Sequence, residues 1–181
     1  HAILFHVLPD MGPVYTVSII PTGVGAAGYT MPLPENANIF NTKNKMLHNI
    51  MVSLGGRIAE ELIFEDITTG ASQDIKQVTQ LARSMVTEYG MSDRLGLINY
   101  DSGEGDEVFL GKEIGQPRPY GERVATIIDE EVKDIVDDCY KKARAIIEEH
   151  MEVLHSCAKL LLEKERINQS EFETLFEGTE A

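Results

Sequence analysis

Apolar side chains recur every three or four positions through three long segments of this 181-residue sequence. Such spacing is typical of amphipathic helices, which turn once every 3.6 residues and bury one face. The three segments run over 46–63, 75–86 and 124–147. Two shorter helices are expected at 151–164 and 170–176, with Asn168 or Ser170 capping the second of them. The chain is therefore predicted to be mainly α.

Two adjacent glycines, Gly55 and Gly56, lie inside the first of these apolar stripes. Each glycine lowers the stability of a helix by about 1 kcal/mol relative to alanine, because it has more backbone freedom to lose. We expect close packing of another segment against this face to compensate for that cost.

A small β-sheet is expected near the N-terminus. Residues 14–20, "VYTVSII", are β-branched and aromatic and predict a strand, and "YTMPL" at 29–33 predicts a second, shorter one. Pro32 indicates a sheet edge, because proline cannot donate to a ladder. The intervening "GVGAAG" matches a dinucleotide-binding glycine pattern, but "YTMPLPEN" follows where that motif requires a helix, so we interpret it as a turn in a hairpin.

The length suits one domain, 1–181. Within it we expect a core with the edge hairpin at 1–100, a loop at 101–121, where glycine, proline and charged residues concentrate, and a C-terminal helical part at 122–181.

The charge balance excludes some classes of partner. The chain has 16 basic and 30 acidic residues, a formal net charge of −14. A nucleic-acid surface needs clustered lysine and arginine, so no nucleic acid is expected as a partner. The longest uncharged stretch, 11–33, is broken by prolines and glycines and does not predict a membrane-spanning helix. The two cysteines, Cys139 and Cys157, are expected to be reduced.

Two carboxylates are candidates for a functional site. Glu60 borders the first apolar stripe, where a carboxylate needs a partner such as an imidazole N–H. Asp74 follows Ser72, a plausible N-cap, in the first turn of the next predicted helix, where the helix dipole favours its ionised form. The apolar face of that helix is predicted to be Ile75, Val78, Leu81, Ala82, Met85 and Val86. From the residues alone, simple capping with dipole stabilisation is the favoured explanation of Asp74, ahead of a functional role.

Several motifs in register resemble one family. They are "HAI" with "LPD", "VSIIPTG", "GYTMPLP", "GGRIAEELIF", "TTGASQDI", "QLARSMVTEYGMSDRLG", "VFLGKEI" and "IIDEEVKDIV". Together they are similar to the peptidase domain of the FtsH family, the membrane-anchored ATP-dependent zinc metalloproteases of bacteria and their organelles. The resemblance implies a zincin-like metallopeptidase fold with C-terminal helices.

The resemblance also implies roles for particular residues. In that family a helix carries His-Glu-x-x-His, in which both histidines bind zinc and the glutamate is the general base. His1 matches the second histidine, so the resemblance places the catalytic glutamate before residue 1, outside this sequence. Asp74 matches the third zinc ligand, and Glu60 matches a glutamate that orients a zinc-binding histidine. One Zn²⁺ per chain is expected.

The strand containing Gly28, Tyr29, Thr30 and Met31 resembles the family strand to which an extended substrate adds by backbone hydrogen bonds. The resemblance further implies unfolded polypeptide substrates, a homo-hexamer, and an upstream AAA ATPase domain that binds the ATP. Transmembrane segments would hold the peptidase domain on the cytoplasmic side of the bacterial inner membrane. Because this sequence lacks the His-Glu pair, a non-catalytic helical assembly or adaptor domain is the alternative function.

Overall fold

The computed structural model describes residues 1–21, 28–32, 40–101 and 120–178. Its elements in chain order are α1 Ala2–Val7, β1 Val14–Ser18, β2 Tyr29–Pro32, α2 Lys43–Phe64, the 3₁₀ turn η1 Thr69–Ala71, α3 Ser72–Thr87, α4 Glu122–Glu149, α5 Met151–Lys164, β3 Arg166–Asn168 and α6 Gln169–Glu177. The predicted class, mainly α with a small sheet, is confirmed. Most of the predicted 101–121 loop lies outside the described residues.

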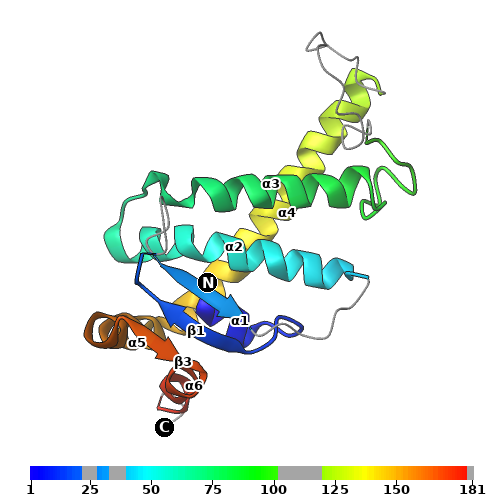
Figure 1. The fold of residues 1–181 in the computed structure, drawn as a ribbon. Helices are drawn as coiled ribbons and strands as arrows, with labels where there is room; N and C mark the ends of the chain where they lie inside the picture. The colour runs from blue at the N-terminus through cyan, green and yellow to red at the C-terminus, as the bar shows by residue number, and fades with distance from the viewer. Residues whose placement is uncertain (22–27, 33–39, 102–119, 179–181) are drawn as a thin grey trace, which may run out of the picture.

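Helices α2 and α3 lie side by side, and the long helix α4 crosses both (Figure 1). The N-cap of α2 is Thr42, whose hydroxyl accepts a hydrogen bond from the Lys45 amide. The core between these helices and α1 contains six residues with no exposed surface: Leu4, Ile50, Ile58, Ala82, Met85 and Ala143. Two residues of the predicted α3 face do not join it: Ile75 is 43% exposed, and Val86 is buried in a separate cluster with Leu95 and Ile128.

The sheet has three antiparallel strands in the order β2-β1-β3. The predicted hairpin of β1 and β2 is confirmed, and Pro32 ends an edge strand as expected. Gly28 immediately precedes β2 and lies very close to β1. A Cβ atom at this position would be 2.3 Å from the Ser18 carbonyl oxygen. Strand β2 follows the glycine pattern directly, so the helix that dinucleotide binding requires is not formed. The predicted first strand is shorter than expected and ends at Ser18.

Strand β3 was not predicted, and it comes from the C-terminal part of the chain. Ile167 pairs with Val17, and the Thr16 hydroxyl donates to the Ile167 carbonyl oxygen at 2.9 Å. The apolar face of the sheet packs on α5 and α6 in a second core that includes the fully buried Phe172. The predicted cap of α6 is confirmed: Asn168 and Glu171 form a reciprocal capping box.

His6 of α1 reaches this second core. Its ring stacks on Phe176 of α6 with centroids 4.0 Å apart, so one face of the ring is covered while the rest of the residue is exposed. The pKa of His6 lies below its ordinary value, mainly because burial disfavours the charged form. Nearby His150 lowers the pKa of His6 further, and Glu173 opposes both effects.

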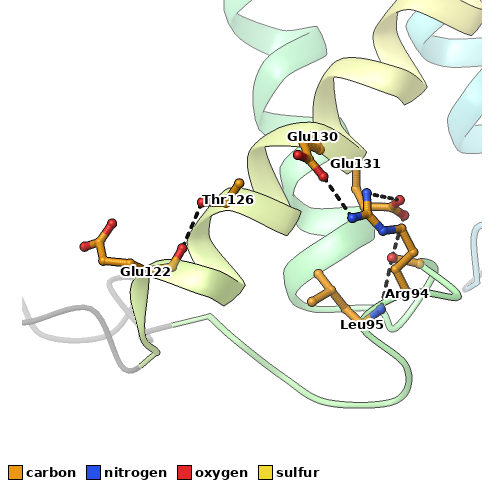
Figure 2. Close-up of polar contacts among 7 residues, drawn as sticks. Arg94, Leu95, Glu122, Thr126, Glu130 and Glu131 are labelled. Atoms are coloured by element: carbon orange, nitrogen blue, oxygen red, sulfur yellow. Dashed lines mark hydrogen bonds and ion pairs between the residues drawn. The ribbon is translucent and has the colours of Figure 1, made fainter.

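The segment after α3 is held against α4 by charged contacts (Figure 2). The guanidinium of Arg94 donates to Glu130 at 2.8 Å and lies 3.6 Å from Glu131, and the Ser92 hydroxyl donates to Glu131 at 2.5 Å. Among the described residues, no helix is both long and apolar enough to cross a membrane.

Candidate metal centre

His1 stands at the start of α1 and lies against the middle of α2. Its Nδ1 atom is 2.6 Å from the Val52 carbonyl oxygen. Because a carbonyl oxygen can only accept a hydrogen bond, Nδ1 carries the proton in this contact. The lone pair of the neutral ring is then on Nε2, which is the form in which an imidazole binds a metal ion.

The paired glycines of α2 make this approach possible. A Cβ atom at Gly56 would lie 2.9 Å from His1 Nε2, and one at Gly55 would lie 3.0 Å from the His1 backbone nitrogen and 2.9 Å from Leu4 Cδ1. The expected close packing at the glycines is therefore confirmed. The segment that packs there is α1, together with His1.

Asp74 comes from the first turn of α3 and meets His1. Its Oδ2 atom is 3.5 Å from His1 Nε2, and the two side chains are 32% and 35% exposed. Two ligand atoms about 2 Å from a tetrahedral zinc ion lie about 3.3 Å apart. The separation of the carboxylate oxygen and the ring nitrogen therefore fits two ligands of one zinc ion.

The start of α3 differs from the prediction. Ser72 is the first helical residue and not the N-cap, which is Ala71, and Ala71 makes no side-chain capping bond. The preceding turn η1 is capped instead by Thr68, whose Oγ1 accepts from the Gly70 amide at 3.1 Å. Asp74 lies in the first turn of α3, as predicted.

The two adjacent glutamates of α2 face different partners. Glu60 accepts the Thr68 hydroxyl at 2.5 Å and the Thr68 amide at 3.2 Å, and these two bonds hold its pKa below the ordinary value. Glu61 accepts hydrogen bonds from Tyr140 and Arg144 of α4. The role of Glu60 toward a zinc-binding histidine stays a prediction, because its direct partner in the structure is Thr68.

Within the described residues, no cluster of three or more His, Cys, Asp or Glu side chains could hold a metal ion. His1 and Asp74 are thus two candidate ligands, and the described residues add no third. Val52, Thr68 and the 3₁₀ turn were missed as parts of the site. The double glycine signalled close packing on this part of α2, but it gave no indication of Thr68 or of the turn.

The predicted substrate-binding strand corresponds to β2, which Gly28 precedes and which contains Tyr29, Thr30 and Met31. Within the part of the chain that the structure describes, β2 pairs only with β1, which leaves its other edge open. Tyr29 accepts a hydrogen bond from Arg166 of β3 at 2.5 Å, across the outer face of the sheet.

The sequence model of peptidase family M41 matches residues 1–175. The chain belongs to this family. Among its M41 relatives is ATP-dependent zinc metalloprotease FtsH 1 of Thermoanaerobacter sp. strain X514, 47% identical over 98% of this chain and 29% of that protein. FtsH proteins of Caldicellulosiruptor bescii and Thermotoga maritima are 47% and 46% identical over 97% and 94% of the chain. The resemblance to the FtsH family is therefore confirmed.

The chain spans 29% of the length of the first of these M41 relatives and 28% of the other two. All three are named ATP-dependent zinc metalloproteases. Their names fit the chemistry of the His1 and Asp74 pair, whose nitrogen and oxygen ligands both suit zinc.

Proposed function

We propose that the chain is the zinc-dependent endopeptidase domain of an ATP-dependent protease. The observation that carries this proposal is the 3.5 Å approach of His1 Nε2 to Asp74 Oδ2, two groups 73 positions apart in an M41 sequence. His1 and Asp74 would hold one Zn²⁺ per chain together with a ligand from residues before His1. Zinc, when bound, would supply Lewis-acid polarisation of a peptide carbonyl group and activation of water.

This chain's own residues would prepare that site. The Val52 carbonyl fixes the tautomer of His1, and the glycines of α2 leave room for its ring. The edge of β2 that pairs with no described strand would accept an extended polypeptide through backbone hydrogen bonds, which favours broad sequence tolerance and unfolded substrates.

The parent protein would carry an AAA ATPase domain that binds ATP, and the relatives' description as ATP-dependent supports the use of ATP. We further propose that it is a homo-hexamer anchored in the bacterial inner membrane, with this domain on the cytoplasmic side. Its substrates would be unfolded, misfolded and membrane proteins.

Metal analysis of the parent protein tests the ligand assignment. Wild-type protein is expected to contain about one zinc per chain, and Asp74→Asn to lose most of it, because a carboxamide is a far weaker zinc ligand than a carboxylate. Asp93→Asn, an exposed aspartate beyond α3, is the matched control and should retain zinc. Full zinc occupancy in Asp74→Asn would refute the assignment. Zinc-free wild-type protein would instead support a non-catalytic assembly domain.

A further inference from the structure

Thr68 connects α2 to the beginning of α3 through four hydrogen bonds. Its hydroxyl and its amide both donate to the Glu60 carboxylate, at 2.5 and 3.2 Å. Its hydroxyl oxygen accepts from the Gly70 amide at 3.1 Å, and its carbonyl oxygen accepts from Arg57 Nη2 at 2.9 Å. Every backbone and side-chain polar group of this residue is therefore engaged, and Glu60 and Arg57 both belong to α2.

The path from Thr68 to Asp74 leaves little freedom. It consists of η1 and the first turn of α3, whose backbone angles are set by their internal hydrogen bonds. The N-cap of α3 makes no side-chain bond of its own, so the Thr68 contacts are the side-chain anchor of this helix start. The position of Asp74 thus depends on how firmly Thr68 is held to α2.

His1 is fixed to the same helix. The Val52 carbonyl oxygen bonds to its ring, and Gly56 leaves room for the ring. Both residues are on α2, eight and four positions before Glu60. The two candidate ligands are therefore positioned from one rigid element, one by direct packing and the other through Thr68.

We propose that Thr68 is a positioning residue for the metal centre, holding Asp74 at the distance from His1 that one ion requires. This inference rests on the proposed zinc site. It also gives Glu60 a different role from the predicted one, because Glu60 acts on the aspartate through Thr68. The Glu60 carboxylate suits this role, since its two oxygens separately accept the hydroxyl and the amide.

The decisive variant is Thr68→Val, which keeps the size and β-branching of the side chain and removes its hydroxyl. In the parent protein, competition with a chelator should show zinc affinity about tenfold weaker than wild type. Mutating the hydrogen-bond partners that orient metal ligands has an effect of this size at other metal sites. In the metal-free protein, the Gly70 amide should exchange its hydrogen faster, while the unfolding midpoint stays nearly unchanged because Thr68 is exposed.

Two further variants separate positioning from general disturbance. Thr68→Ser restores the hydroxyl and should recover most of the zinc affinity. Thr69→Val removes a neighbouring exposed hydroxyl that makes no hydrogen bond to any described residue, and its affinity should equal that of wild type.

Zinc binding by Thr68→Val with wild-type affinity would overturn the inference and leave the proposed function intact. Unaltered binding by Asp74→Asn would instead overturn the zinc site itself. If Thr68→Val does not fold, Glu60→Gln decides, because its amide oxygen can replace only one of the two carboxylate acceptors. Weaker zinc binding in a folded Glu60→Gln protein supports the inference, and wild-type affinity refutes it.

Discussion

Gly56→Ala is expected to have opposite consequences for helix formation and for metal binding. The added methyl carbon would lie 2.9 Å from His1 Nε2 and 3.4 Å from Cε1. Carbon atoms do not approach a ring nitrogen this closely without strain, so the imidazole must move away from α2. The displaced atom is Nε2, the one that faces Asp74.

The effect on stability can be worked out from two opposing contributions. Alanine in place of glycine stabilises a helix interior by about 1 kcal/mol. Moving the His1 ring breaks the 2.6 Å hydrogen bond to the Val52 carbonyl, which costs about 1 kcal/mol net. Because the His1 side chain is 35% exposed, it can rotate outward without repacking the core. The free energy of unfolding of the metal-free variant should therefore lie within about 1 kcal/mol of wild type.

Zinc affinity should fall much further. A metal ion must lie about 2.0–2.1 Å from Nε2, and the alanine methyl displaces that nitrogen relative to Asp74. We expect a loss of tenfold to a hundredfold, or about 1.4 to 2.8 kcal/mol of binding free energy. Chelator competition on the parent protein measures the affinity, and thermal unfolding monitored by circular dichroism measures stability.

Gly178→Ala is the control, because a Cβ atom there meets no atom of the described residues within 4 Å. It should leave zinc affinity unchanged. Wild-type zinc affinity in Gly56→Ala would refute the reasoning, since it would mean that the ring does not need the space above the glycines to bind metal.

Two further predictions concern the cores. Phe172→Ala should lower the free energy of unfolding by about 3–5 kcal/mol in chemical denaturation, because this side chain of α6 is fully buried against the sheet. Burial raises the pKa of the Cys139 and Cys157 thiols to about 11 each, so at pH 8 only about 0.1% of each is thiolate. Both should therefore react with a thiol reagent far more slowly in the folded protein than in denaturant; equal rates would contradict their burial.

Periodicity was sufficient to predict the long helices and the hairpin, because each of these buries one face over many residues. The stripes at 46–63 and 124–147 became α2 and α4, and Pro32 correctly indicated the sheet edge. The apolar pattern was misleading at Ile75, an apolar residue in the first turn of α3 that remains exposed.

Strand β3 could not be predicted from its own residues. It has three residues, too few for alternation to be visible, and its partner β1 lies about 150 positions earlier. The meeting of His1 and Asp74 is equally non-local. The residues alone favoured capping for Asp74, and only the family resemblance paired it with His1 before the structure placed the two side chains 3.5 Å apart.

The two candidate ligands come from segments that would not keep their helical structure in isolation. The six-residue α1 and the first turn of α3 are too short to be stable in water as isolated helices. Helix α2, with 22 residues and a side packed on α4, supplies the rigidity: it holds His1 through Val52 and Asp74 through Thr68. Because a bound ion would join these two segments only when both rest on α2, metal binding and folding of this region should stabilise one another.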